Sequence, residues 1–269
     1  MSRNFWIGTV VALLLAAAGT YVFFSRMTND TSGETAAAPQ TLPAAQPEPA
    51  PAPPAAEEHH PVSEPQAPGL PALPDSDSAV HEALAGVFGA ATLKTLLLPQ
   101  NIVRNLVATI NSLDDSAPVA ARLRPLAHVP GSPVVDGEGD ALTLSPKNSA
   151  RYTPYVDAMR QAGGRRAGQV YLRLYPLFQS AYEEMGFKGR YFNDRLVQII
   201  DHLLATPKVL APIQLLRPKV LYEFEDSDLE ARSWGQKLLI RMGSENEAVV
   251  KAWLREVRAT VVAQPPPKE

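Results

Sequence analysis

The residues that could do chemistry are concentrated in one segment, which runs from Gly189 to Pro207. This segment contains two carboxylates, Asp194 and Asp201, and a histidine, His202, directly after the second carboxylate. A pair of carboxylates can act as general acid and base on a glycosidic bond, and a histidine with an aspartate partner can act as an oriented base. These residue types make a hydrolase the first hypothesis to compare with their spacing.

The spacing of these groups argues against catalysis. On a helix, Asp194 and Asp201 lie about 10.5 Å apart along the axis, which exceeds the ~5–9.5 Å between the carboxyl groups of glycosidases. Asp201 and His202 are neighbours in sequence, and neighbouring side chains on a helix diverge by about 100°. The chain also lacks GxSxG, HExxH, P-loop and GxGxxG motifs. We therefore expect no catalytic residue and no cofactor.

Arginine and tyrosine side chains around the same segment favour a binding function, because these residues are frequent anchors of recognition surfaces. If Arg190, Arg195 and Tyr191 converged in a cleft, they would suit an anionic peptide or the carboxylate of a glycan. The alternative interpretation is structural: arginine–aspartate pairs can tie helices together, and Asn193 and Asp194 are favoured as helix caps. The candidate binding surface consists of Arg190, Tyr191, Asp194, Arg195, Arg151 and Tyr152.

No metal site is expected. The chain has no cysteine, which excludes disulfides and cysteine-ligated zinc. His59 and His60 follow two glutamates, but a proline-rich linker gives them no fixed geometry. Asp136, Glu138 and Asp140 alternate in a glycine-containing loop that lacks the closing glutamate of an EF-hand, so a turn is favoured over a calcium site.

The elements that position these residues are mainly helices. In the central segment, Asn193 is expected to cap a helix that Pro207 ends. One face of this helix is charged, and the other is a broad apolar stripe that a helix would gather against a core. The stripe consists of Leu196, Val197, Ile199, Ile200, Leu203 and Leu204.

Apolar periodicity before the central segment predicts helices over 75–88, 92–98 and 100–113, with Arg104 and Asn105 facing outward. A small hairpin could form over 134–144. Two proline-started short helices follow, and then a long helix over 165–185 that contains Pro176.

After the central segment, 209–224 is expected to be extended and partly strand-like. Ser227–Glu230 matches a capping box that would open one helix ending at Gly243. Ser244–Glu247 matches another that would open the last helix. We therefore predict a compact, mainly α domain of about seven helices over 75–262, with a disordered tail over 263–269.

The amino-terminal part of the chain has a different composition. Phe5–Phe24 has no charged residue and is long enough to span a bilayer, which predicts an uncleaved membrane anchor over 1–27. A cleaved signal peptide is the alternative, but the apolar run extends beyond a typical signal core. Residues 28–74 hold twelve of the 26 prolines and almost no large apolar residue, so we predict a disordered linker.

The charge distribution argues against nucleic acid as a partner. Only two of the 25 basic residues and six of the 28 acidic residues precede Asp75, which leaves 23 basic and 22 acidic residues for the domain. A nucleic-acid-binding domain usually carries a basic excess. The weak charge bias around Phe5–Phe24 favours a short amino-terminal tail and a translocated domain, hence a periplasmic location.

Several strings in the domain are specific enough to indicate a relationship: Tyr175–Gln179, Tyr191–Val197, Asp201–Pro207, Pro218–Tyr222 and Gly235–Gly243. Over roughly 73–261 the chain resembles a bacterial family known as domain of unknown function three thousand and fourteen. The resemblance implies an amino-terminal membrane helix, a Pro/Ala-rich linker and this domain. It implies no activity and no catalytic residue.

Together these observations predict a single-pass protein of the bacterial inner membrane, held through Phe5–Phe24, whose helical domain binds a protein or a peptidoglycan-type polymer of the envelope. A scaffold subunit of an envelope complex is the alternative interpretation. A hydrolase acting on envelope material ranks third.

Overall fold

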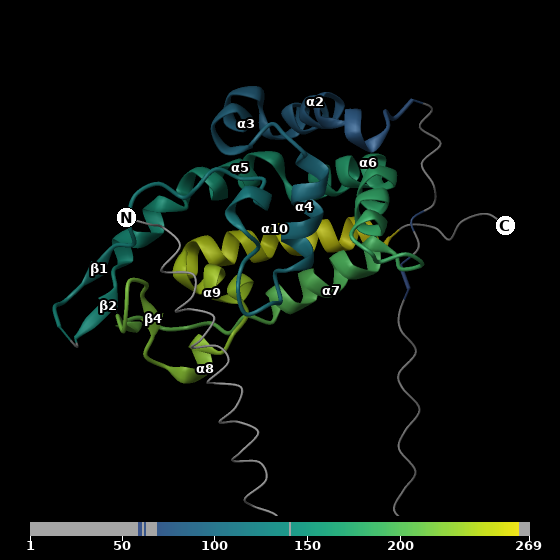
Figure 1. Cartoon of the computed structure of the whole chain (residues 1–269). Coiled ribbons are helices and arrows are strands. Elements are labelled where there is room, and N and C mark those ends of the chain that lie inside the picture. Colours follow the sequence, from purple (N-terminus) through teal and green to yellow (C-terminus); the bar gives the residue numbers. More distant parts are fainter. Residues whose placement is uncertain (1–58, 61, 63–68, 140, 264–269) are drawn as a thin grey trace, which may run out of the picture. The chain divides into compact units, whose positions relative to one another are not determined.

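The computed structural model describes residues 59, 60, 62, 69–139 and 141–263, all of which belong to one compact unit, Ala56–Glu269. This part of the chain is mainly helical, as predicted, and carries one small antiparallel sheet (Figure 1). The nine α-helices of the described residues exceed the predicted number of about seven, in part because the single helix predicted from Ser227 to Gly243 is divided into two shorter ones. Short 3-10 helices lie at Leu73–Asp75, Ala121–Leu123 and Pro146–Arg151. The α-helices are α2 (Asp77–Phe88), α3 (Ala90–Leu96), α4 (Ile102–Asn111), α5 (Thr153–Ala162), α6 (Gly164–Glu184), α7 (Phe192–Leu204), α8 (Ser227–Glu230), α9 (Trp234–Arg241) and α10 (Ser244–Val262).

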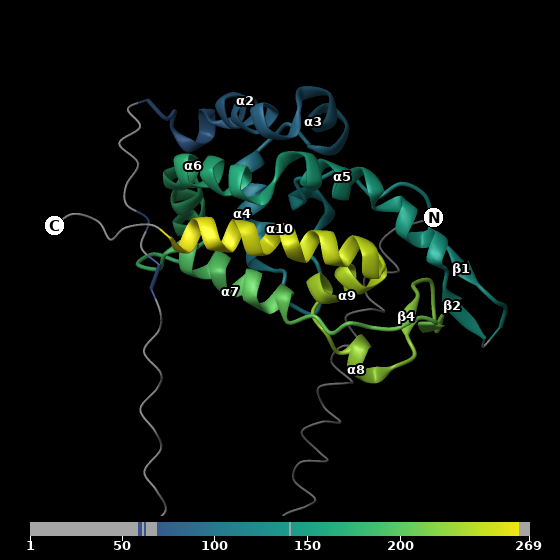
Figure 2. The same cartoon turned by 180° about the vertical axis from the view of Figure 1, so that it is seen from behind.

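Helix α10 runs through the middle of the domain, with α6 and α7 packed along it (Figures 1 and 2). Two glycines of α6 allow α6 and α10 to approach closely. A Cβ atom on Gly164 would overlap the carbonyl oxygen of Trp253, and one on Gly168 would lie 2.9 Å from Cβ of Thr260. Since real Cβ atoms do not tolerate such distances, this contact requires glycine at both positions.

Two apolar cores hold the helices together. The first lies between α2, α3, α4 and α6 and includes Phe192 from the start of α7. The second lies between α5, α7, α9 and α10 and contains most of the apolar stripe predicted for the central segment. Of that stripe, Leu196, Val197, Ile199, Ile200 and Leu203 are buried, as expected for a core-facing helix.

The sheet lies at one end of the domain, beside α8 (Figures 1 and 2). Its four antiparallel strands follow chain order: β1 (Val135–Asp136), β2 (Leu142–Leu144), β3 (Gln214–Leu216) and β4 (Glu223–Phe224). The predicted hairpin over 134–144 and the predicted extended segment over 209–224 are both confirmed. They join in one sheet through the pairing of Leu142 with Leu215, and Leu215 and Phe224 pack on Ile240 of α9.

Several expected helix starts and one expected surface residue were wrong. Asn193 does not cap α7, which begins one residue earlier, at Phe192. Asn193 is instead fully buried. Its amide oxygen accepts a hydrogen bond from the Tyr171 hydroxyl, and its amide nitrogen donates one to the carbonyl oxygen of His60, so burial leaves neither group unsatisfied. Asn105 is also buried rather than outward-facing, and its side chain donates to the carbonyl oxygen of Gln100.

The two expected capping boxes were wrong as well. Asp226, not Ser227, caps α8, and α8 ends after four residues at Glu230. A separate helix, α9, then begins at Trp234 with Ser233 as its cap. At the start of α10 no side chain caps the helix, since the carboxylate of Glu247 instead pairs with Lys251.

The predicted membrane anchor at Phe5–Phe24, nearly all of the predicted linker before Gly69, and all but the first residue of the predicted tail lie outside the described residues. Within the part that is described, none of the helices combines the length and apolar character needed to cross a bilayer. The described end of the predicted linker is in contact with the domain. Val62 packs against the first core, and Leu73 is buried in it.

Candidate functional site

Arg195, one of the predicted binding residues, ties two helices together. Its guanidinium donates to the side chain and the carbonyl oxygen of Asn111, at 2.9 and 2.6 Å, and forms a two-pronged ion pair with Asp114 at 2.6 and 2.9 Å. This pairing joins α7 to the segment that follows α4. The donors of Arg195 are therefore largely used within the domain.

Arg151 and Tyr152 lie elsewhere, where the 3-10 helix Pro146–Arg151 meets α5. Arg151 donates to the carbonyl oxygens of Pro130 and Gly131, at 2.9 and 2.7 Å, and so fastens a loop. Tyr152 is buried in the second core.

Arg190, Tyr191 and Asp194 do lie together, at the start of α7. Asp194 accepts a hydrogen bond from the backbone N–H of His60 at 2.7 Å, and its other oxygen lies 2.9 Å from Nδ1 of His59. Tyr191 is half exposed and meets the His59 ring edge-on. The structure therefore separates the predicted residues into three places, and at one of them the chain's own His59–His60 segment binds.

The two carboxylates considered for catalysis are also separated by their partners. Asp201 forms a two-pronged ion pair with Arg258 of α10, at 2.6 and 2.9 Å. Asp194 binds the His59–His60 segment, as described above. In residues 59–60, 62, 69–139 and 141–263, no three histidine or acidic side chains gather in a way that could hold a metal ion.

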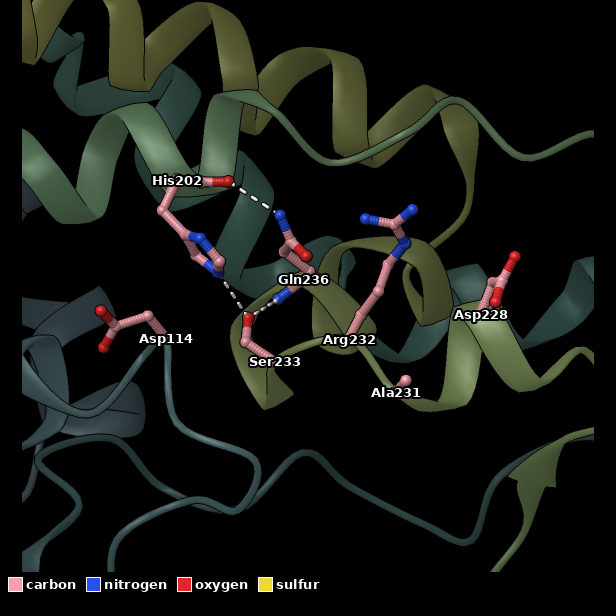
Figure 3. Close-up of a pocket in the computed structure, with 7 residues that line it drawn as sticks. All are labelled: Asp114, His202, Asp228, Ala231, Arg232, Ser233 and Gln236. Carbon is pink, nitrogen blue, oxygen red and sulfur yellow. Dashed lines mark hydrogen bonds between the residues drawn. The ribbon is translucent and has the colours of Figure 1, made fainter. Parts of the chain in front are cut away.

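An open hollow of about 490 Å³ lies between α7, two turns beyond Arg195, and the α8–α9 connection (Figure 3). Figure 3 shows Gln236 between His202 and Arg232, with Asp228 on the far side of Arg232. We call this feature the Arg232 hollow. Its lining residues are Asp114, His202, Asp228, Ala231, Arg232, Ser233 and Gln236.

His202 and Ser233 resemble a base and a nucleophile, because Nε2 of His202 lies 2.8 Å from Oγ of Ser233. However, Ser233 Oγ also caps α9 by accepting the N–H of Gln236 at 3.2 Å. The two preceding amides of α9 donate to the carbonyl oxygens of Asp115 and Leu113. With all three amides occupied, this helix start offers no oxyanion hole, so the geometry does not support nucleophilic catalysis.

Arg232 contributes to this hollow a side chain with one unsatisfied donor. Its Nε is buried, and among the described residues no acceptor lies within hydrogen-bond distance of that atom. None of the ion pairs found in the same part of the chain involves Arg232 or the exposed Asp228. A buried donor left without an acceptor costs about 1–3 kcal/mol. Because solvent does not reach this atom, an anionic or carbonyl group in the hollow would relieve that cost once the Arg232 side chain turns toward it.

The sequence prediction missed Arg232 and Ser233 because both were placed inside one continuous helix. A signal for the break was present. Ser233-Trp234-Gly235-Gln236 itself fits the S-x-x-Q form of a capping box and competes with the Ser227–Glu230 pattern.

A salt bridge between Glu230 and Lys237 holds the α8–α9 connection and predicts a pH effect. Burial raises the pKa of Glu230, but hydrogen bonds from Lys237 Nζ at 2.7 Å and from the N–H of Phe224 at 2.9 Å outweigh it, so the pKa lies below its ordinary value. A carboxylate whose pKa is lower in the folded than in the unfolded state stabilises the fold at pH values above the unfolded-state pKa, which is about 4.3 for glutamate. This contribution is lost as the pH falls through the folded-state pKa.

We therefore expect Glu230→Gln to lower the free energy of unfolding by about 1 kcal/mol at pH 7, with the difference from the wild type shrinking below pH 4. Urea unfolding at both pH values measures this difference. Glu225→Gln, at an exposed position nearby, is the control and should change little at either pH. A Glu230→Gln effect of equal size at both pH values would contradict the ionic explanation.

The described part of the chain is a mainly helical domain with an open hollow lined mostly by polar residues. The family model described as protein of unknown function (DUF3014) matches residues 102–258, and the chain belongs to this family. The match confirms the resemblance and extends from the start of α4 into the last helix. No curated protein and no solved structure matches the chain.

Proposed function

We propose that this chain is a membrane-anchored binding module of the bacterial envelope, whose domain binds a carboxylate-bearing protein or envelope polymer in the Arg232 hollow. The observation that carries the proposal is the buried Nε of Arg232, which has no acceptor within the described part of the chain. A guanidinium matches the two oxygens of a carboxylate, and such charge-assisted pairs are stronger than neutral hydrogen bonds.

The other groups in the hollow suit a ligand with both acceptors and donors. Asp228 is exposed beside Arg232 and can accept from an amide or an ammonium group. Gln236 donates to the carbonyl oxygen of His202 at 2.9 Å, and its amide oxygen is an acceptor for a donor group of the ligand. A peptide that carries a free carboxylate and amide groups, such as the stem peptide of a peptidoglycan-type polymer, offers this combination.

The proposed location rests on the sequence. Phe5–Phe24 has the length and composition of a membrane-spanning helix, and the proline-rich stretch after it is suited to a tether. A domain presented in this way on the periplasmic side would meet envelope proteins and polymers, which gives the binding hypothesis its ligand class.

The test is calorimetric titration of soluble peptidoglycan fragments into the wild type and three variants. We expect Arg232→Ala to lower the affinity about 10- to 100-fold, because a hydrogen bond to a charged group contributes about 1.5–3 kcal/mol. Arg232→Lys should recover part of the loss, since it keeps the charge but not the fork. Arg190→Ala removes an exposed arginine outside the hollow and should leave the affinity unchanged.

Thermal unfolding separates binding from folding in the same variants. Arg232→Ala removes an unsatisfied buried donor, so its Tm should stay equal to that of the wild type or rise. Fragments that bind the wild type and Arg232→Ala equally well would contradict the proposed site.

A further inference from the structure

The turn between β3 and β4, Arg217–Tyr222, exposes apolar side chains to an unusual degree. Val220 is 79% exposed and Leu221 75% exposed, although the two are adjacent and both are large aliphatic residues. Leu210, in the segment that leads into β3, is 76% exposed. Exposed apolar residues that lie side by side, unlike ones scattered singly, can mark an interaction surface.

The same stretch is basic. Lys208–Tyr222 contains Lys208, Arg217 and Lys219 and no acidic residue; the first acid after it is Glu223, which pairs with Leu216 in the sheet. The guanidinium of Arg217 lies over the Tyr222 ring at 5.3 Å. Lys208 and Lys219 are exposed, and neither takes part in an ion pair found among the described residues.

A firm base supports this turn. Leu215 and Phe224, which pair across β3 and β4, are 2% exposed and pack with Ile240 of α9. The sheet lies at one end of the domain, so the turn is carried on a supported hairpin at that end (Figures 1 and 2). Val220 and Leu221 can therefore move from water into an apolar environment outside the protein without unfolding the residues beneath them.

We infer that the Arg217–Tyr222 turn binds an anionic bilayer surface, with Val220 and Leu221 inserted at the boundary between headgroups and acyl chains and Lys219 beside the lipid phosphates. Charge complementarity favours this occupant, because the exposed cations Arg217 and Lys219 directly precede the apolar pair and the turn itself contains no acid; the first acid, Glu223, lies in β4. A protein partner would need a matched interface of about 800 Å² on this chain, whereas a bilayer accepts a single turn.

This surface differs from the Arg232 hollow, and its role does not require Phe5–Phe24 to span a membrane.

The test uses the full chain and a fluorescent reporter that responds only to the surroundings of the labelled residue. Because the chain has no cysteine, Val220→Cys can be labelled with an environment-sensitive fluorophore at a single position. Met185→Cys, at a position 43% exposed at the end of α6, gives the matched control.

Labelled protein is mixed with vesicles of phosphatidylcholine alone or of phosphatidylcholine with phosphatidylglycerol. We expect the fluorophore at Val220 to report an apolar environment only with the anionic vesicles, and the fluorophore at Met185 to report none with either. Adding Lys219→Gln should lower the lipid affinity of the turn about fivefold, the ratio that corresponds to removing one cation near a charged membrane.

Three results would overturn the inference. One is an unchanged signal at Val220 with anionic vesicles, and another is an equal signal with neutral vesicles. The third is a signal that needs added envelope protein and no lipid, which would identify the turn as a protein-binding surface.

Discussion

Replacing Phe192 with alanine is expected to lower the free energy of unfolding by about 3–5 kcal/mol, the range for deleting a buried phenylalanine ring. The ring is fully buried at the first residue of α7. It stacks on Phe178 at a centroid distance of 5.8 Å and meets Tyr182 at 5.4 Å. These contacts belong to the first core, so the ring fixes the start of α7 against α6.

The position of Phe192 makes the effect larger than a local cavity would suggest. The rest of the apolar stripe of α7 packs in the second core. Tyr171 packs against both cores, and the centroid of its ring lies 6.4 Å from that of Phe192. Loss of the ring therefore leaves a cavity where the two cores meet. Denaturant unfolding followed by circular dichroism measures the effect.

Tyr191→Ala is the matched control, because it removes the adjacent aromatic ring from a position that is 53% exposed. Its effect should stay within about 0.5 kcal/mol. Equal losses for the two variants, or a loss below about 1 kcal/mol for Phe192→Ala, would contradict a role for this ring in joining the cores.

Much of the helical pattern could be predicted from the sequence because it is local. The stripe from Leu196 to Leu204 repeats at helical spacing, and only a core-facing helix satisfies it. The helix starts were harder, since two capping patterns, Ser227–Glu230 and Ser233–Gln236, follow each other closely and a short helix begins at each of them. The joining of the two extended segments through Leu142 and Leu215 depends on partners far apart in sequence, which periodicity does not reveal.

The candidate site could be predicted less well, and the reason is the same. Arg195 and Arg232 are equivalent as residue types, but the first is satisfied by Asn111 at the end of α4 and by Asp114 just after it. Nε of the second is buried without an acceptor in the described structure. Sequence therefore indicates that arginines matter here. Only the tertiary arrangement shows which of them retains binding capacity.

Replacing Gly235 with alanine is expected to destabilise the domain by about 1–3 kcal/mol, although alanine is the better helix former. A Cβ atom there would lie 2.5 Å from the carbonyl oxygen of Leu113 and 2.9 Å from Cδ2 of Leu203. The first neighbour is backbone and also accepts the N–H of Gly235 at 3.2 Å, so it cannot move away without losing that hydrogen bond.

Gly86→Ala is the matched control for this substitution, because Gly86 is an exposed helical glycine of α2, and no atom lies within 4 Å of the position that a Cβ would take there. At this position the helix propensity of alanine acts alone and should raise the free energy of unfolding by about 0.5–1 kcal/mol. Opposite signs for the two variants in urea unfolding would locate the cost of Gly235→Ala in the contact with Leu113. Stabilisation by both alanines would contradict the close packing of α9 on this segment. Because the neighbouring Asp114 lines the Arg232 hollow, Gly235→Ala should also weaken ligand binding there.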